Sequence, residues 1–348
     1  MPFIQNILKY NSISIVGTAK NTGKTTCLNY VIKRLKEENV NFAVTSIGVD
    51  GEERDVLYQT PKPRITLCKN MIFITSEEDY ANKEFPADIL DVSKRTTPLG
   101  KLITARANGN GNVVLSGPSD SKWLSEVISG MEKYGVRLTL VDGALSRMSL
   151  ASPAITDAMI LCTGAACSAQ LRELIQKTKF RCQLIELEKV ENKIQEQLMP
   201  LENDLWQLNN KTNQWEKICN SVFTLEKESK NKLENLKTVY VSGAVTNNFI
   251  KILSTKKSQN TQLIIRDFTK LFVEPATFQK FVRRGGSIKV LQKPKLLAVC
   301  TNPVSPEGIR LNPTVLKEEM QVVLQVPVYD IKMVDSFLFT SEYTCPNK

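Results

Sequence analysis

Residues 13–28 read ISIVGTAKNTGKTTCL, and the rest of the 348-residue chain is organised around this stretch. The β-branched residues within 13–16 predict a buried strand. A loop follows over 17–23, and apolar residues then recur at helical spacing from 24 to about 38, which predicts an amphipathic helix. A strand, a loop and a helix in this order are the context in which a phosphate-binding loop occurs. The alternative is an ordinary glycine turn before a helix that happens to contain Gly-Lys-Thr.

The residue types in this stretch suit an anionic ligand. Backbone N–H groups of the loop and of the first helical turn can converge on phosphate oxygens. Lys24 can reach the terminal phosphates as a catalytic group, and the Thr25 hydroxyl can ligate Mg²⁺. We therefore expect this segment to hold a nucleoside triphosphate, ATP, together with Mg²⁺. The expected nucleotide contacts are Gly17, Thr18, Lys20, Asn21, Thr22, Gly23, Lys24, Thr25 and Thr26.

A second stretch, RLTLVDGA at 137–144, predicts a buried strand that ends in an acid and a glycine. A carboxylate at the end of such a strand can reach Mg²⁺ or its water shell, so Asp142 is a candidate catalytic and metal-binding residue. Asp50 ends the strand expected over 42–50 and is a second candidate metal ligand. For Asp50, a solvated acidic turn is the alternative. Carboxylates at the carboxyl ends of parallel strands would meet beside the loop.

Composition narrows the chemistry further. The chain has no histidine, which excludes Ser-His and Cys-His nucleophile pairs and histidine metal sites, whereas phosphoryl transfer works with lysine, carboxylates and Mg²⁺. The eight cysteines are scattered and none forms Cys-x-x-Cys, which argues against a metal or dithiol motif. The net charge of +10 comes largely from dispersed lysine that is not interleaved with aromatic residues, so we do not expect nucleic-acid binding. No apolar run is long enough to cross a membrane and the N-terminus lacks signal-peptide features, so we expect a cytoplasmic protein.

Strand-like apolar runs alternate with helical patterns along the chain. This alternation predicts an α/β fold with a mostly parallel, doubly wound sheet. Between 186 and 237 the sequence becomes polar and rich in Glu, Lys and Asn, with a hairpin expected over 205–215. We expect a nucleotide-binding core over 1–185, a polar insertion over 186–237, and a C-terminal α/β part over 238–348 that completes or flanks the core. A lid, a dimer arm, a partner surface and a solvated spacer are the alternatives for the insertion.

The spacing around the loop resembles the dethiobiotin synthetase branch of the P-loop NTPases. Counting back from Gly23 places Thr18 where the common pattern has its first glycine, so the loop reads GT-xxxx-GKT. Ala19 stands where ATPases of the ParA and MinD type carry an additional lysine, and Lys20 is displaced from that place by one residue. The resemblance implies a P-loop fold and ATP as the ligand.

A late run, TNPVSPEG at 301–308, resembles the stretch in which dethiobiotin synthetases use an Asn after a strand to recognise adenine. The resemblance implies this role for Asn302, and a simple Asn-Pro turn is the alternative. The same family carries Glu-Gly-Ala or a similar run where this chain has Asp142-Gly-Ala. The shorter aspartate reaches less far toward a metal ion.

A narrower resemblance concerns the use of ATP. The runs VGTAKNTGKTTCLNY, GVDGEERD and LVDGALSRMSLASPAITDA are similar to the reactivase, an accessory ATPase subunit of adenosylcobalamin-dependent lysine 5,6-aminomutase. The resemblance implies a slow ATPase of lysine degradation that helps to exchange damaged cobalamin, with the aminomutase and a MutS-like ATPase as partners. A homodimer is a further expectation. The alternatives are an ATP-dependent small-molecule ligase or kinase of the dethiobiotin synthetase type, and a nucleic-acid-associated ATPase.

Overall fold

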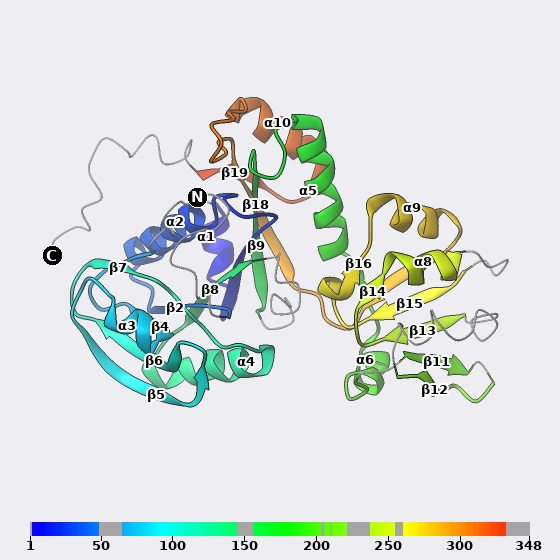
Figure 1. Ribbon diagram of the computed structural model, residues 1–348, viewed down its shortest axis with the longest axis horizontal. Coiled ribbons are helices and arrows are strands. Elements are labelled where there is room, and N and C mark those ends of the chain that lie inside the picture. Colours follow the sequence, from blue (N-terminus) through cyan, green and yellow to red (C-terminus); the bar gives the residue numbers. More distant parts are fainter. Residues whose placement is uncertain are drawn as a thin grey trace. The chain divides into compact units, whose positions relative to one another are not determined.

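The computed structural model describes residues 2–48, 65–144, 156–202, 205–209, 211–220, 237–254 and 260–331. Within these ranges the chain forms two compact units (Figure 1). Unit 1 contains the described residues up to 181 and from 294 onward, and unit 2 contains those from 182 to 293. The chain passes from unit 1 into unit 2 within helix α5 (Leu171–Ile185).

Unit 1 is built around a nine-stranded sheet. Its strands are β1 (Ser12–Gly17), β2 (Phe42–Ser46), β4 (Ile72–Ser76), β5 (Ala87–Thr97), β6 (Gly100–Ala107), β8 (Leu138–Ala144), β9 (Ala158–Gly164), β18 (Lys295–Asn302) and β19 (Val328–Asp330). They lie in the order β19-β18-β9-β1-β8-β2-β4-β6-β5. Every neighbouring pair from β19 to β4 is parallel, whereas β6 pairs antiparallel with both β4 and β5. Strands β3 (Ile65–Leu67) and β7 (Gly111–Val113) form a separate antiparallel pair.

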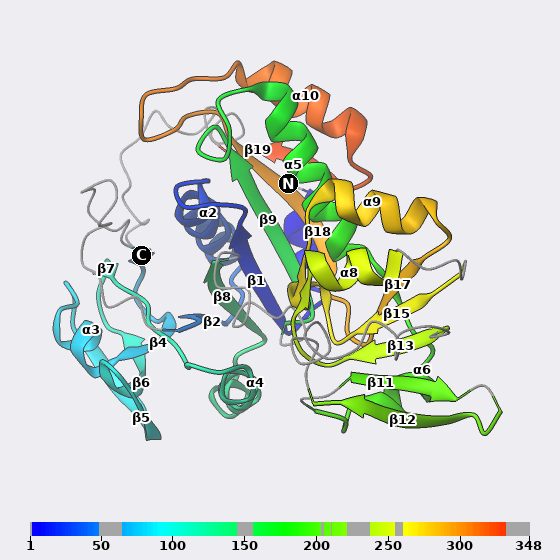
Figure 2. The same ribbon diagram turned by 45° about the vertical axis from the view of Figure 1, so that its right-hand side comes forward.

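Helices cover both faces of this sheet (Figure 2). They are α1 (Pro2–Ile7), α2 (Lys24–Glu37), α3 (Glu77–Ala81), α4 (Ser121–Gly130), the 3₁₀ helix η1 (Met131–Tyr134), the first part of α5, and α10 (Pro313–Val323). Leu138 and Leu140 of β8 pack in one apolar cluster with α1 and α2, whereas Val141 packs in another with Leu124 of α4. Because side chains alternate along a strand, these two clusters lie on opposite faces, as in a doubly wound sheet.

The structure confirms the α/β class and the mostly parallel sheet. It also contains a long antiparallel hairpin, β5–β6, that periodicity does not predict. Side-chain burial along β5 is irregular because two register shifts interrupt its pairing with β6. The turn between the two strands depends on Gly100, whose φ of 89° lies in the left-handed region that favours glycine.

Unit 2 has a sheet of its own, with six strands in the order β10-β17-β15-β13-β11-β12. These strands are β10 (Glu188–Lys189), β11 (Leu205–Asn209), β12 (Gln214–Cys219), β13 (Thr238–Val241), β15 (Gln262–Ile265) and β17 (Ser287–Val290), and a separate parallel pair consists of β14 (Val245–Thr246) and β16 (Leu271–Phe272). The helices are α6 (Asn192–Leu198), α8 (Asn247–Ser254), the 3₁₀ helix η3 (Phe268–Lys270) and α9 (Pro275–Arg283). The hairpin expected over 205–215 is present as β11 and β12.

Unit 2 is longer than the insertion expected from composition. The sequence predicts an insertion over 186–237. In the structure, however, β11 pairs antiparallel with β13, and β13 pairs parallel with β15. These pairings join the polar segment to the apolar strands that follow, as far as Lys293, in one unit. The part of the chain that returns to unit 1 begins at Pro294 and supplies β18, α10 and β19.

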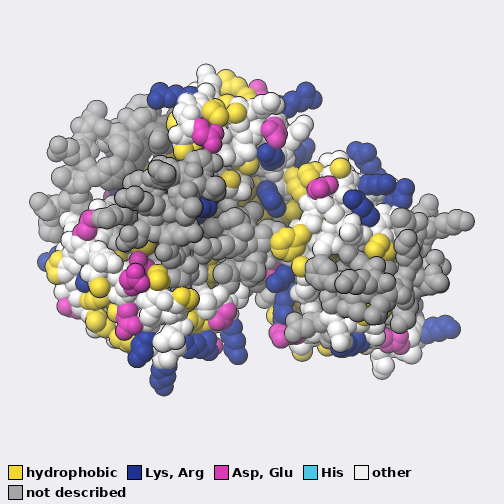
Figure 3. All heavy atoms as spheres, in the orientation of Figure 1, with side chains coloured by type: hydrophobic (Ala, Val, Ile, Leu, Met, Phe, Trp, Pro, Cys, Tyr) yellow, Lys and Arg dark blue, Asp and Glu magenta, His cyan; other side chains and the backbone are white. Residues whose placement is uncertain are grey.

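The length of the helices and the distribution of charged side chains can be compared with the expectation of no membrane and no nucleic-acid partner. Among the residues that the structure describes, no helix is both long and apolar enough to span a membrane. On the face in Figure 3, Lys and Arg side chains are spread among Asp and Glu side chains over the described surface of each unit. This distribution follows the dispersed lysine of the sequence.

Candidate functional site

The loop between β1 and α2, residues 18–23, lies where the direction of the sheet reverses. After β1 the chain builds β2, β4 and β8 on one side of that strand, and then β9, β18 and β19 on the other. In doubly wound sheets such a reversal opens a crevice at the carboxyl ends of the strands, and ligands bind there. The loop therefore occupies the position where this fold most often holds a ligand.

The backbone of the loop can present N–H groups to an anion. Asn21 and Gly23 both lie in the left-handed region, with φ of 59° and 89°, and such residues turn successive N–H groups toward one side. Gly23, which has no side chain to cap the helix, is the residue before α2, and its carbonyl accepts the Cys27 N–H at 2.9 Å. The N–H groups of residues 24–26 thus precede the first helical hydrogen bond and have no acceptor within the helix.

The Lys24 side chain turns back along the loop toward the end of β1. A Cβ atom on Gly17 would lie 2.9 Å from both Cγ and Cδ of Lys24, and 2.5 Å from Thr22 Oγ1. Residue 17 must therefore be glycine for the lysine stem to lie there. Thr22 is buried, and its hydroxyl donates to the Ala19 carbonyl at 3.0 Å, which closes the loop on itself.

Thr18, which stands where the common pattern has glycine, attaches the loop to the neighbouring strand. Its N–H donates to the Cys162 carbonyl at 2.9 Å, and its hydroxyl donates to Thr163 Oγ1 at 3.1 Å. The Thr163 hydroxyl is in turn hydrogen-bonded to Thr178 of α5 at 2.9 Å, and both of these threonines are buried. A chain of three hydroxyls thus links the loop, β9 and α5.

Asp142 lies on β8 next to β1, with its Cα in register with Ile15. It has the same phase along the strand as Leu140, so its side chain is on the face that α2 covers. Its carbonyl accepts hydrogen bonds from Ser46 Oγ and Ile47 N–H, both at 3.1 Å. These bonds hold the end of β8 to the end of β2 and fix the position of the carboxyl group.

Among the described residues, the carboxyl group of Asp142 has no partner for one of its two oxygen atoms. Its Oδ1 atom is buried and has no hydrogen-bond partner within the described part of the chain, which normally costs stability. Burial raises the pKa of this carboxyl, while the nearby charge of Lys24 acts to lower it. A buried carboxylate oxygen that has no donor among the described residues is the kind of group that a cation satisfies.

This environment fits Mg²⁺. In sites that also bind phosphates, Mg²⁺ is held by one or two protein oxygens together with phosphate oxygens and water. Asp142 and the half-buried Thr25, in the first turn of α2, could supply those two oxygens. Across the described ranges, no group of three or more His, Cys, Asp and Glu side chains could hold a metal on its own. Asp50, the other expected ligand, lies outside the described residues.

Asn302, at the end of β18, contacts the loop directly. Its Nδ2 donates to the Asn21 carbonyl at 3.2 Å, and its Oδ1 accepts the Val304 N–H at 3.3 Å. A Cβ atom on Gly23 would lie 3.1 Å from the Asn302 Cβ. The residue expected to recognise the base therefore has both ends of its amide bonded to backbone atoms, one of them in the loop.

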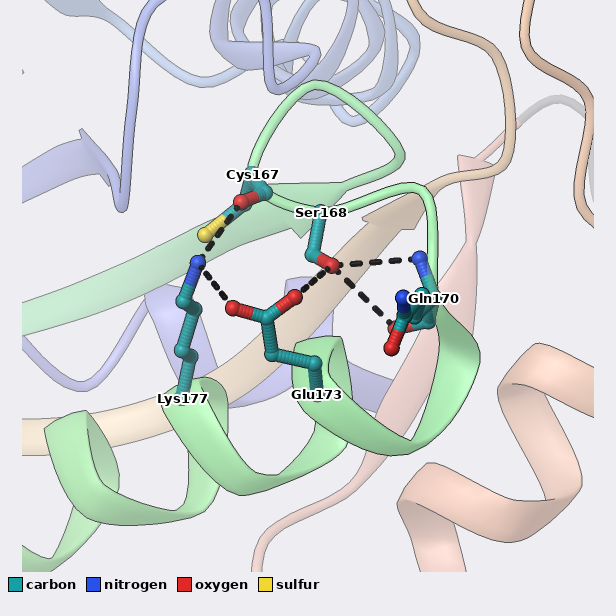
Figure 4. Close-up of polar contacts among 5 residues, drawn as sticks. All are labelled: Cys167, Ser168, Gln170, Glu173 and Lys177. Atoms are coloured by element: carbon teal, nitrogen blue, oxygen red, sulfur yellow. Dashed lines mark hydrogen bonds and ion pairs between the residues drawn. The ribbon is translucent and has the colours of Figure 1, made fainter.

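The turn from β9 into α5 holds a cluster of polar side chains, drawn in Figure 4. Ser168 Oγ accepts the Gln170 N–H at 3.1 Å and donates to Glu173 Oε2 at 2.6 Å. Lys177 Nζ bridges Glu173 Oε1 at 2.8 Å and the Cys167 carbonyl at 3.2 Å. Lys177 and then Ser168 lower the pKa of Glu173. Because these groups satisfy one another, the cluster serves to fix the start of α5.

Two other features of unit 1 involve none of the expected site residues. The buried thiols of Cys27 and Cys300, on α2 and β18, lie 3.6 Å apart. A cavity of about 400 Å³ lies between the β5–β6 hairpin and the α4–η1 segment, with Trp123 and Met131 among its lining residues. None of the residues that line this cavity belongs to the loop or to β8.

The structure brings most of the expected site residues to the carboxyl ends of the central strands of the sheet. The loop, Lys24, Thr25 and Asp142 lie together there, and Asn302 joins them from β18. Lys20 is on the exposed part of the loop. Sequence reasoning did not select Thr163 and Thr178, which are ordinary threonines in a strand and a helix and become partners of the loop only through the order of the strands.

Comparison with known proteins adds no relative from which a role could be transferred. No protein-family model matches the chain, and no curated protein or solved structure matches it either. The assignment of a function therefore depends on the residues and geometry of this chain.

Proposed function

We propose that the chain binds ATP with Mg²⁺ at the loop of residues 17–26 and hydrolyses it slowly. The observation that carries the proposal is the position of the Lys24 side chain, which lies against Gly17 at the reversal point of the sheet. Its charge acts to lower the pKa of the Asp142 carboxyl, whose Oδ1 atom is buried. The buried Oδ1 atom of Asp142 costs stability while it has no partner within the described chain, and the Lys24 ammonium group and the N–H groups at the start of α2 are donors suited to an anion. A phosphate group would pair with these donors, and its metal ion would pair with the Asp142 carboxylate.

The roles of the chain's own groups follow from their positions. The N–H groups of the loop and of the first turn of α2 hold the phosphates, and Lys24 neutralises the terminal phosphate oxygens. Thr25 and Asp142 hold Mg²⁺, which when bound offsets the charge that develops on the transferred phosphate. Histidine is absent from the chain, so no imidazole base is available to activate water, and we expect slow intrinsic hydrolysis.

ATP is the nucleotide that we propose, and the support comes from the sequence. The chain contains no Asn/Thr-Lys-x-Asp run of the kind that reads guanine. For the use of the hydrolysis energy we propose a partner protein, in the manner of an aminomutase reactivase. The support is the resemblance of three sequence runs, of which nearly all of the second and much of the third fall outside the described residues.

Phosphate release from ATP and from GTP, with Mg²⁺ present, tests the proposal on the full chain. We expect slow phosphate release from ATP by the wild type. In Lys24→Ala the rate should fall at least about 100-fold, because the variant lacks the positive charge that neutralises the terminal phosphates. Lys33→Ala is the matched control, since Lys33 is an exposed lysine on the same helix. Equal release by the wild type and Lys24→Ala would overturn the assignment.

The same assay separates the partner from a small-molecule substrate. Addition of an adenosylcobalamin-dependent aminomutase should raise release by the wild type and leave Lys24→Ala unchanged. If a carboxylate or an amine raises turnover with no second protein present, the ligase or kinase alternative replaces the partner-directed one. ATP binding itself would stand in both cases.

A further inference from the structure

We propose that Asn302 is a positioning residue that holds the phosphate-binding loop in its binding shape, and does not read the base. The inference rests on the proposed function, since it concerns the same loop. It differs from the expectation drawn from the sequence, in which the Asn302 amide recognises adenine. The two roles require the amide to face different groups, so the structure and an experiment can separate them.

The first observation is the use of the amide. Asn302 donates from Nδ2 to the Asn21 carbonyl and accepts at Oδ1 from the Val304 N–H, at 3.2 and 3.3 Å. In the major groove of DNA, an Asn that recognises adenine uses Nδ2 and Oδ1 side by side. Here the same two atoms bond to the backbone of two different residues. The chain itself therefore sets the plane of the amide.

The second observation is the conformation that this bond supports. Asn21 has φ of 59° and Gly23 has φ of 89°, and a non-glycine residue in this region costs of order 1 kcal/mol or more. In a concave anion site the N–H groups point inward while the carbonyls point away. The bond from Asn302 engages the Asn21 carbonyl, so it stabilises the arrangement in which the N–H groups are left for the anion.

The third observation is the rigidity of Asn302 itself. Its carbonyl accepts the Ala165 N–H at 2.9 Å, and its side chain lies against Gly23. A Cβ atom on Gly164 would lie 2.1 Å from the Asn302 carbonyl oxygen, so the ends of β9 and β18 are in close contact. A residue fixed in this way can impose a conformation on a loop that it touches. Asn302 therefore preorganises the loop before a ligand arrives.

A base-free ligand tests the proposal. The affinities of ATP, GTP and inorganic tripolyphosphate, each with Mg²⁺, are compared for wild type, Asn302→Leu and Asn302→Ala by calorimetric titration of the full chain. Asn302→Leu keeps the approximate size of the side chain and adds no charge beside the anion site, but it removes the amide that bonds to Asn21 and Val304. We expect both variants to lose affinity for all three ligands by a similar factor, about tenfold or more. Asn82→Ala, an exposed asparagine of unit 1, should bind as the wild type does.

The possible results lead to different conclusions. A loss confined to ATP, with tripolyphosphate unaffected, overturns the proposal in favour of adenine recognition. Unchanged affinities in Asn302→Leu also overturn it, because they would mean that only the packing of the side chain matters. If the wild type binds neither ATP nor tripolyphosphate, the proposed function itself fails and the inference falls with it. Should one variant fail to fold, as judged by circular dichroism, the other still decides between the two roles.

Discussion

Burial and charge act in opposite directions on Asp142. Burial raises the pKa of its carboxyl and the charge of Lys24 lowers it, with burial as the larger effect. In the unfolded chain this carboxyl has a pKa of about 3.9. The folded protein therefore binds a proton there more readily, and its stability falls as the pH rises from about 4 through the raised pKa. Above that pKa the carboxyl group is ionised in the folded protein, and the cost of burying its charge lowers the free energy of unfolding by a constant amount.

Asp142→Asn should remove the cost of burying an ionised carboxyl group, because the amide carries no charge. Without nucleotide, we expect its melting temperature near neutral pH to exceed that of the wild type by about 2–4 °C, from about 1 kcal/mol of relieved desolvation. The gain should shrink as the pH falls below the raised pKa, and it should be smallest below about pH 3, where the wild-type carboxyl is protonated in both the folded and the unfolded state. Thermal unfolding over this pH range provides the measurement, with the exposed Asp88→Asn as control. A pH-independent gain, or a lower melting temperature at neutral pH, contradicts the explanation.

Single residues were predictable where a local pattern places them. Lys24 and Thr25 follow a strand and a loop, and Asp142 ends an apolar strand, so neighbouring residues alone indicate their chemistry. The contact of Asn302 with Asn21 was not predictable, because 281 residues separate them and the order of the strands brings them together. The hydroxyl chain from Thr18 depends on that order in the same way.

At the scale of elements, the ends of β9 and β18 approach more closely than a side chain allows. A Cβ atom on Gly164 would meet the Asn302 carbonyl oxygen at 2.1 Å and the carbonyl carbon at 2.9 Å. Gly164→Ala must push backbone atoms apart, and we expect it to cost about 2–3 kcal/mol. The urea midpoint of the full chain measures this loss. Because the shift moves Asn302, Gly164→Ala should also weaken ATP binding.

Gly130→Ala is the matched control for this substitution. Gly130 is the last residue of α4, and a Cβ atom there meets no described atom within 4 Å. We expect an unchanged midpoint or a gain of up to about 1 kcal/mol, because alanine favours the helix. If the two variants have the same midpoint, the strand ends are not as close as described.

The elements themselves could be predicted where each has one clear period. The central strands are apolar runs and α2 has helical spacing, so both patterns are visible in the sequence. The β5–β6 hairpin shows neither pattern, because bulges change which residues of β5 face the sheet. Its turn, with Gly100 in a left-handed conformation, is the one local signal that it carries.

At the scale of the molecule, each unit has an apolar core of its own. In unit 2 the core cluster consists of Val190, Leu198, Tyr240, Ile264 and Leu291. The change of composition at 186 comes close to the start of this unit, but its end could not be predicted. The strands β13 and β15 are short apolar runs like β18, and such a run indicates a buried parallel strand without indicating which sheet it joins.

Two separate cores predict two unfolding transitions in a calorimetric scan of the full chain. Ile264→Ala, which leaves a cavity in the core of unit 2, should cost about 2–5 kcal/mol and lower one of them. That variant identifies the transition of unit 2. Mg-ATP at about 100 times its dissociation constant should add about 2.7 kcal/mol to the free energy of unfolding of the unit that contains the binding site. We expect it to raise only the other transition, because the loop, Asp142 and Asn302 all belong to unit 1.

The variants of the proposed site make this scan decisive. Lys24→Ala should lose the shift with Mg-ATP, and Lys33→Ala should keep it. If Mg-ATP raises the transition that Ile264→Ala lowers, the nucleotide is bound by unit 2 and the assignment to the loop is wrong. If a single transition responds to both, the two units unfold together and nucleotide bound to unit 1 stabilises unit 2 as well. That linkage would couple the binding of nucleotide in unit 1 to the stability of unit 2.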